Sequence, residues 1–117
     1  MNLPAHVVPV LRAGAGEPAD AAPDRIVSGS GASTVWNAFT DAAGRFHAGH
    51  WSSEAGVRRV EYTETELCVL LEGRVRLEGT GGAVEFGPGE AFVIAAGFRG
   101  VWESLGRVTK IYAVLEP

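Results

Sequence analysis

The sequence of 117 residues has a single cysteine, Cys68, so it cannot form a disulfide within the chain. It also lacks an excess of positive charge, because its net charge at pH 7 is −4, which argues against a basic face for nucleic acid. No apolar run approaches the roughly 20 residues of a membrane span, and the N-terminus does not resemble a secretory signal. We therefore expect a cytoplasmic protein with neither a membrane nor nucleic acid as its partner.

Helical periodicity is missing as well, because no segment repeats apolar residues at a sustained interval of 3.6 positions. What the sequence does have is 16 glycines and an apolar content of 46%. Short apolar runs separated by glycine predict an all-β fold with a buried core. The length fits one domain.

The N-terminal part of the chain differs from the rest. Ala, Gly, Pro and Asp dominate residues 1–32, which predicts a partly ordered N-terminal arm followed by a folded domain over residues 33–117. In that domain, short runs of strand-forming residues alternate with turn signals, as in a β-sandwich or barrel. The predicted strands are 34–39, 45–52, 57–62, 66–71, 74–78, 83–86, 91–95, 99–103 and 108–115.

Two of these runs, 67–71 and 91–95, are apolar on both faces. A strand with one face in water should alternate between apolar and polar residues. Both strands are therefore expected to be covered on both sides. Because a small barrel has few spare elements to cover an outer face, we expect a homodimer.

Two segments resemble the sequence motifs of the cupins. Glu66–Gly73 is similar to the end of the first cupin motif, and Gly89–Gly97 is similar to the second, with Ala95 where the family usually has proline. A glycine-rich turn and the segment Phe86–Gly89 lie between them, also where the family has them. The resemblance covers roughly residues 33–117 and implies a double-stranded β-helix, the cupin jelly-roll barrel.

Within the cupins, the sequence looks most like a group of small single-domain proteins. This group is related to (S)-ureidoglycine aminohydrolase and to the ethanolamine-utilisation cupins. The segments that carry the similarity are Gly49–Trp51, Tyr62–Glu66, Gly97–Glu103 and Lys110–Tyr112. Such a resemblance informs the fold better than the chemistry.

Typical cupins hold a divalent metal with three histidines and one glutamate. The spacing of the family places these ligands at positions 59, 61, 66 and 100, which here are Arg59, Glu61, Glu66 and Gly100. A guanidinium cannot coordinate a metal, and two carboxylates alone would make a weak site for a hard cation. We therefore expect no bound transition metal and no other cofactor.

The orientation of positions 59 and 61 has two interpretations. In the family's register, Arg59 and Glu61 face the interior with Glu66 and form a pocket for a small carboxylate, amine or sugar. Alternatively, Arg59 and Glu61 lie on a solvated face while Val60 and Tyr62 point inward. A shift by one residue exchanges the two faces of a strand, so no third arrangement exists.

Aromatic residues near these positions are further candidates. Trp102 lies two residues beyond the vacant histidine position, and with Phe98 it could form the apolar wall of a ligand site. The alternative is that Trp102 is a core residue that fills space, and the same ambiguity applies to Trp51.

Four other polar or reactive residues lie in the predicted strands. His47 and His50 are three positions apart, which places them on opposite faces of a strand, so they cannot bind one ion without a bulge. Cys68 has the spacing to face the interior, where a cysteine is usually inert. Lys110 either pairs with an acidic residue near the pocket or marks the outside of the barrel.

The leading hypothesis is a metal-free cupin that binds a small polar molecule in its barrel. Its predicted ligand-binding residues are Glu66, Glu61, Arg59, Trp102, Phe98 and Tyr62. Two alternatives stay open: a metal-dependent enzyme resembling (S)-ureidoglycine aminohydrolase that acts on a small nitrogenous substrate, and a structural dimer whose barrel is filled by side chains. The sequence assigns no catalytic residue.

Overall fold

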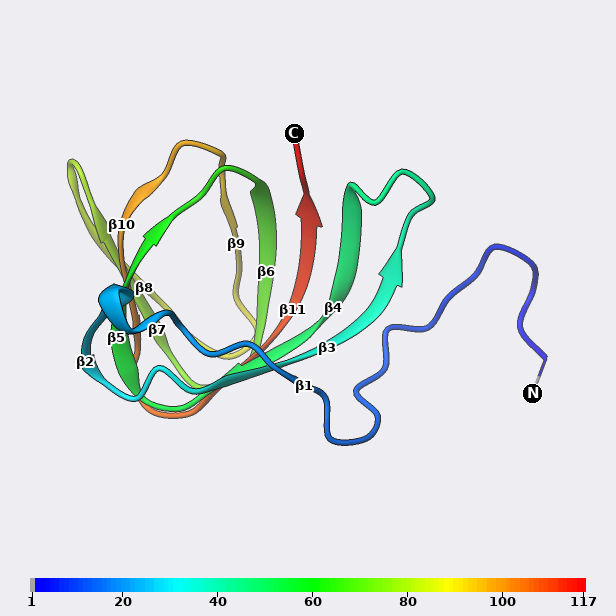
Figure 1. The fold of residues 1–117 in the computed structure, drawn as a ribbon, viewed down its shortest axis with the longest axis horizontal. Helices are drawn as coiled ribbons and strands as arrows, with labels where there is room; N and C mark the ends of the chain where they lie inside the picture. Colours follow the sequence, from blue (N-terminus) through cyan, green and yellow to red (C-terminus); the bar gives the residue numbers. More distant parts are fainter. Residues whose placement is uncertain (1) are drawn as a thin grey trace.

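A computed structural model describes residues 2–117, which form strands and one short 3-10 helix (Figure 1). In chain order the elements are β1 (Glu17–Pro18), η1 (Pro23–Arg25), β2 (Ile26–Gly29), β3 (Ser33–Thr40), β4 (Phe46–Ser53), β5 (Gly56–Glu61), β6 (Thr65–Glu72), β7 (Val75–Gly79), β8 (Gly82–Phe86), β9 (Ala91–Ile94), β10 (Arg99–Ser104) and β11 (Val108–Leu115). Within these described residues, no helix has the length and apolar character needed to cross a membrane.

The strands form two antiparallel sheets that face each other (Figure 1). The first has the order β1-β3-β4-β11-β6-β9, and the second has the order β2-β5-β10-β7-β8. From β4 onward the chain crosses between the sheets at every step except the β7–β8 hairpin, and this connectivity is that of a jelly roll. The predicted double-stranded β-helix is therefore confirmed.

Each run that was predicted as a strand is a strand, with ends displaced by a residue at most. The sheets also include chain upstream of residue 33. Strand β1 pairs with β3, and strand β2 pairs with β5. Residues 2–16 precede the first strand. Their N-terminal end projects away from the barrel (Figure 1), whereas the later part contacts the outer face of β3 and β4, where Trp36 donates a hydrogen bond to the carbonyl oxygen of Gly14 at 3.0 Å and His50 lies 3.2 Å from that of Val10.

The core lies between the sheets and consists of apolar side chains from five strands. Its buried members are Cys68, Leu70, Val75, Leu77, Phe92, Ile94, Trp102 and Val108. Strand β6 shows how these positions arise, because Cys68 and Leu70 point inward while Leu67 and Leu71 point outward and are 42% and 47% exposed. Among residues 2–117, Leu67 and Leu71 thus stay partly exposed on the outer face, where a full cover was expected.

A bulge adjusts the register of the strand that carries the site. Opposite β6, Thr109 pairs with Glu72 and Lys110 pairs with Leu70, so one residue of β6 has no partner at this point. After the bulge, Lys110 points into the barrel between Trp51 of β4 and Leu70 of β6.

Candidate functional site

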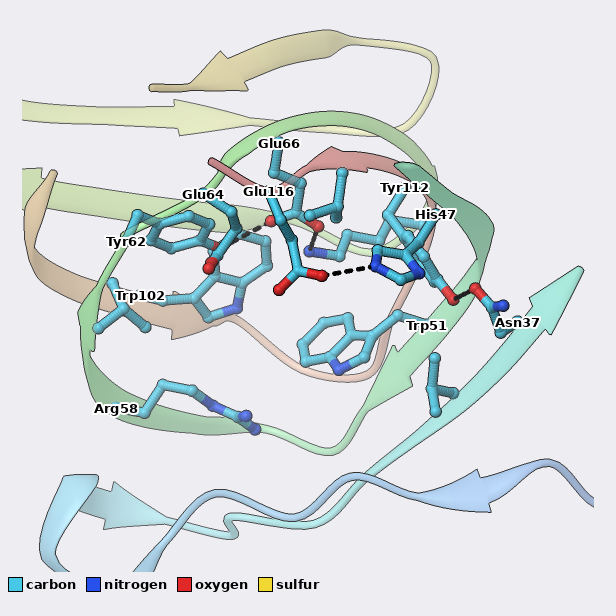
Figure 2. A pocket seen from close by; sticks show the side chains of 14 residues that line it. Asn37, His47, Trp51, Arg58, Tyr62, Glu64, Glu66, Trp102, Tyr112 and Glu116 are labelled. Atoms are coloured by element: carbon cyan, nitrogen blue, oxygen red, sulfur yellow. Dashed lines mark hydrogen bonds and ion pairs between the residues drawn. The ribbon is translucent and has the colours of Figure 1, made fainter. Parts of the chain in front are cut away.

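A cavity of about 490 Å³ lies inside the barrel between the two sheets (Figure 2). Strands β3, β4, β6 and β11 of one sheet and β5 and β10 of the other contribute to its lining. Its apolar wall consists of Val35, Val60, Val114, Trp51 and Trp102. The remaining lining residues are polar or charged. Tyr112 donates its hydroxyl hydrogen to Oδ1 of Asn37 at 2.7 Å, and the others belong to two groups that differ in burial and in bonding.

The first group is a buried ion pair and its neighbours, which we name the base of the cavity: Glu66, Lys110, Tyr62 and Cys68. Lys110 is the only lysine of the sequence, and its Nζ lies 2.9 Å from Oε2 of Glu66. The two side chains are 6% and 8% exposed. Tyr62 donates its hydroxyl hydrogen to Oε1 of Glu66 at 2.8 Å, so both carboxylate oxygens have a partner (Figure 2).

The ammonium of Lys110 is also surrounded by sulfur and aromatic rings. Its Nζ lies 3.5 Å from Sγ of Cys68, 4.7 Å from the ring centroid of Trp51 and 4.5 Å from that of Trp102. Aromatic faces attract a cation most strongly where water is excluded. Burial by itself lowers the pKa of Lys110, but the charge of Glu66 and the hydrogen bonds to Glu66 and Cys68 outweigh it and raise that pKa above its ordinary value. Lys110 is therefore a permanent cation at neutral pH.

The same environment keeps the neighbouring acids neutral. Burial, followed by the charge of Glu66, raises the pKa of Tyr62 far above its ordinary value. Burial also raises the pKa of Cys68 to about 12, although Lys110 acts in the opposite direction. A thiol that stays protonated is a poor nucleophile, so the interpretation of Cys68 as an inert residue agrees with its surroundings.

Hydrogen bonds on the far side of the aromatic rings fix this arrangement. Trp102 donates its Nε1 hydrogen to Oγ of Ser104 at 3.0 Å, and that hydroxyl lies 2.8 Å from Oγ of Ser53. Trp51 meets Trp102 edge to face, with ring centroids 5.5 Å apart. The two rings are thus held in position independently of any ligand.

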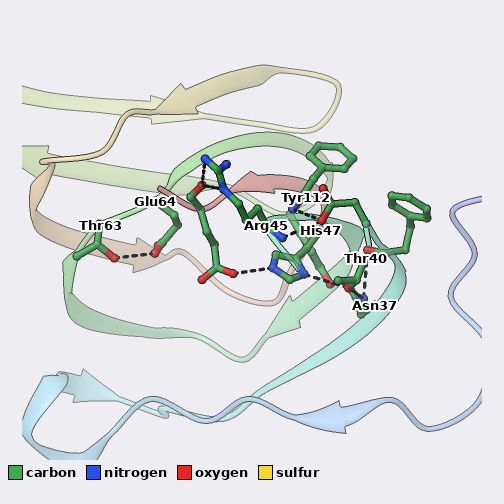
Figure 3. Close-up of polar contacts among 11 residues, drawn as sticks. Asn37, Thr40, Arg45, His47, Thr63, Glu64 and Tyr112 are labelled. Carbon is green, nitrogen blue, oxygen red and sulfur yellow. Dashed lines mark hydrogen bonds and ion pairs between the residues drawn. The ribbon is translucent and has the colours of Figure 1, made fainter. Parts of the chain in front are cut away.

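The second group of polar residues, which we name the rim, consists of Arg58, Glu64, His47 and Glu116. Nε2 of His47 lies 2.8 Å from Oε2 of Glu116, and Nδ1 of the same ring lies 3.0 Å from the hydroxyl oxygen of Thr40 (Figure 3). Both of its ring nitrogens are therefore engaged.

Arg58 and Glu64 differ from that pair because neither has a partner of opposite charge within 4.0 Å among residues 2–117. Glu64 accepts one hydrogen bond, from the hydroxyl of Thr63 at 3.1 Å (Figure 3). Arg58 is half-buried, and its guanidinium lies 5.4 Å from the ring centroid of Trp51. Burial lowers the pKa of Arg58, while Tyr62 and Asp20 act in the opposite direction.

The expectation that Arg59 and Glu61 face the barrel interior is wrong. The pairing of β5 with β10 places Arg58 beside Trp102, so residues 58, 60 and 62 point inward and residues 59 and 61 point outward. Glu61 lies on the outside of the barrel. Its Oε1 is 3.5 Å from Nε of Arg99, and its Oε2 is 3.9 Å from Nη2 of Arg25. The physical reason is the two-residue repeat of a strand, in which a register error of one residue exchanges the faces. The structure thus has the second of the two interpretations.

Of the other predicted residues, Glu66, Tyr62 and Trp102 line the cavity together. Phe98 does not. Its ring packs edge-on against Tyr62, with centroids 6.3 Å apart, and it lines a separate, mainly apolar cavity of about 580 Å³ beside the β7–β8 hairpin and β9. Whether any of these residues binds a ligand stays a prediction.

Sequence reasoning missed Arg58, Glu64, Glu116 and His47 as lining residues. The signal for Arg58 was the alternation of β5 itself, because Val60 and Tyr62 are the residues of that strand that suit an interior. For Lys110, the structure has the first of the two alternatives, since it pairs with Glu66.

The residues present do not fit the metal of typical cupins. Both oxygens of Glu66 are already bonded, one of them to a cation that would repel a metal. A side chain at Gly100 would begin with a Cβ 2.8 Å from the ring of Phe98 and still nearer to the backbone oxygen of Glu78, so this position has no room for a ligand. Among residues 2–117, no group of three or more His, Cys, Asp or Glu side chains could hold a metal ion.

Solved structures with the same fold include one that is also similar in sequence. A Pseudomonas syringae protein of unknown function from the DUF861 family superposes with a TM-score of 0.80 at 30% identity, over 90% of this chain and 46% of its own. The present chain thus spans about half the length of that protein.

Two ethanolamine-utilisation proteins share the fold alone. EutQ of Clostridium difficile matches with a TM-score of 0.64 at 16% identity, over 72% of this chain and 62% of its own. A putative ethanolamine utilisation protein Q of Salmonella typhimurium matches with a TM-score of 0.66 at 14% identity, over 87% of this chain and 98% of its own.

No curated protein matches the sequence. The family model of the EutQ-like cupin domain does match, over residues 40–112, which is more than half of the chain and includes the cavity's strands from β4 to β11. The chain therefore belongs to the EutQ-like cupins.

Proposed function

We propose that the barrel cavity binds a small polar organic molecule directly, without a transition metal. The observation that carries this proposal is that the cavity remains open although its own lysine satisfies its buried carboxylate. Lys110 and Glu66 neutralise each other at the base, and about 490 Å³ remains above them, lined by apolar walls and polar groups of both signs. Cavities of this size with a few placed polar groups are typical of small-molecule sites.

The two alternatives have less support. A barrel with a purely structural role should be filled by its own side chains, and this one is not. An enzyme with the metal of typical cupins would need free ligands, whereas Glu66 is held by Lys110 and Tyr62. A role without catalysis accordingly needs the fewest additional assumptions, and the metal-dependent enzyme becomes an outcome of the test.

The test is a thermal-shift screen of small acids, amines and sugars, followed by calorimetry of each hit. Val114→Phe, which places a larger side chain in the cavity, should abolish binding, because Val114 lines the wall. Val27→Phe is the matched control, since Val27 lies on β2, outside the cavity lining, and is 47% exposed. Metal content is measured in the same preparation, purified without chelators. A stoichiometric metal, or a ligand that Val114→Phe still binds, would overturn the proposal.

We also propose that the protein acts as a homodimer through the outer face of the larger sheet. Leu67 and Val93 are paired across β6 and β9 on this face and are 42% and 60% exposed. Leu71 and Leu115 lie on the same face and are 47% and 53% exposed. Contiguous apolar patches of this kind mark interaction surfaces, and identical copies are the commonest partners.

Light scattering coupled to size-exclusion chromatography tests the dimer. The wild type should elute with the mass of two chains, and the double variant Leu67→Glu with Val93→Glu should elute as one. Val27→Glu, an exposed apolar residue on the other sheet, is the control and should leave the mass unchanged. A wild type that is monomeric at all concentrations would refute this assembly.

A further inference from the structure

The charges at the rim of the cavity carry a further inference, which rests on the proposed function and narrows its ligand class. Arg58 presents a guanidinium that is half-buried, faces the cavity and has no ion-pair or hydrogen-bond partner among residues 2–117. A guanidinium offers donors in a rigid fork that fits a carboxylate through two parallel hydrogen bonds. Removing it partly from water without giving it a partner costs free energy, which a bound anion would offset.

The other arginines of this region do not share the environment of Arg58. Arg59, the next residue along the strand, is exposed and points away from the cavity. Arg25 and Arg99 both lie beside Glu61 on the outside of the barrel. Arg58 is thus the cation that the strand register turns toward the cavity, where Trp51 supports its guanidinium.

The cavity is not a site for an anion alone, because its carboxylates outnumber its cations. Glu64, Glu66 and Glu116 line it against Arg58 and Lys110. A ligand with only negative charge would be drawn to Arg58 but repelled by this excess. The Glu66 charge is offset by Lys110, and Glu116 lies against His47, which leaves Glu64 as the lining carboxylate without a charged partner among residues 2–117.

Figure 2 shows Glu64 and Arg58 on the same side of the cavity, at its upper and lower boundary, with Trp102 between them. Both residues belong to the same stretch of chain, β5 and the turn that follows it. Two opposite charges that line one cavity and have no ion-pair partner among residues 2–117 fit a molecule that carries both charges.

We propose that the cavity selects a zwitterionic amino acid, whose carboxylate binds to Arg58 and whose ammonium binds to Glu64. The carbon chain of the ligand then lies against the apolar wall of Val60 and Trp102. The buried base takes no direct part in this recognition, since its hydrogen-bonding groups already have partners.

The experiment compares three probes with matched carbon chains: 4-aminobutyrate, butyrate and butylamine, with glycine and β-alanine as shorter zwitterions. Calorimetry should show that at least one zwitterion binds about tenfold or more tightly than butyrate or butylamine, since each of these two probes lacks one of the two charge-assisted contacts. Arg58→Gln should weaken that zwitterion at least about tenfold, whereas Arg59→Gln should leave its affinity unchanged.

Glu64→Gln completes the design, because it should lower the affinity for the zwitterion toward that for butyrate. Glu61→Gln, on the outer face, is its control. Circular dichroism of each variant confirms that the barrel is folded. Butylamine or butyrate binding as tightly as the zwitterions, or full affinity in Arg58→Gln, would overturn the inference.

The failure of this inference is distinguishable from failure of the proposed function. If no zwitterion binds, but another small molecule binds to the wild type and not to Val114→Phe, the ligand class is wrong and the proposed function stands. If no small molecule binds to the wild type at all, both fail.

Discussion

The base and the rim of the cavity contain similar residue types but differ in how these residues are bonded. At the base, Glu66 and Lys110 are buried and each bonds to the other and to a further neighbour. At the rim, Arg58 and Glu64 are partly exposed to the cavity and neither has an ion-pair partner within the described chain. The cavity thus contains two opposite charges that are paired with each other at the base, and two at the rim that have no ion-pair partner within the described chain.

This difference assigns different roles to the two regions. A buried ion pair contributes little net stability over apolar residues of equal volume, but it is costly to break because one charge is left unpaired. The base is therefore a structural element of the barrel. Unpartnered charges that face an open cavity contribute little to folding, so they remain available for a ligand.

The largest expected effect comes from breaking the base. Glu66→Ala leaves the Lys110 ammonium buried without its carboxylate, and we expect the free energy of unfolding to fall by about 3–5 kcal/mol. Urea unfolding monitored by tryptophan fluorescence measures the loss, since Trp51 and Trp102 flank the lysine. This cost also makes Glu66→Ala an unsuitable test of ligand binding.

The matched control is the double variant Glu66→Leu with Lys110→Met, which replaces both charges with apolar side chains. It should be more stable than Glu66→Ala, because no unpaired charge remains. A double variant as unstable as the single one would show that the base stabilises the barrel by more than mutual neutralisation. A single variant as stable as the wild type would contradict the proposed division between base and rim.

An alkaline titration has the second largest expected effect. Cys68 has a pKa of about 12 in the folded protein against an ordinary value of 9.0, so between these values the unfolded chain loses its proton first. The free energy of unfolding should then fall by about 1.4 kcal/mol per pH unit for this group. Tyr62, Tyr112 and Lys110 act in the same direction, because folding raises the pKa of each above 10.0, 10.0 and 10.5.

Two measurements check this titration. Urea unfolding from about pH 8 to about pH 11 should show stability that is constant at first and declines above about pH 9, with Cys68→Ala delaying the decline by about one unit. The absorbance of tyrosinate reports Tyr62 and Tyr112, the only tyrosines of the chain, and should rise together with unfolding. Ionisation of both tyrosines in the folded protein near pH 10 would refute the buried base, because Tyr62 belongs to it.

The fold was predictable from sequence, but the orientation of one strand was not. Gly-rich turns and short apolar runs predicted every strand from β3 to β11, because both signals are local. Strands β1 and β2 were missed, since the segments Glu17–Pro18 and Ile26–Gly29 have little strand character of their own and depend on pairing with β3 and β5.

The residues of the candidate site were less predictable from sequence than the strands. Glu66, Tyr62 and Trp102 were predicted to share a site, and they line one cavity. Arg59 and Glu61 were placed by the family's register, and an error of one residue moved both to the outer face. The pairing of Lys110 with Glu66 joins strands that are 44 residues apart in sequence, and no local pattern specifies such a contact.

The smallest expected effect comes from the rim without any ligand. Arg58→Gln removes a contact with Trp51 and no ion pair or hydrogen bond, so it should lower the free energy of unfolding by about 0.5–1 kcal/mol at most. Glu64→Gln loses no ion pair and should stay within about 0.5 kcal/mol of the wild type. Urea unfolding under the conditions used for Glu66→Ala makes the values comparable. If Arg58→Gln destabilises the barrel as much as Glu66→Ala does, then Arg58 is part of the folded framework, and its unpaired guanidinium no longer indicates a ligand.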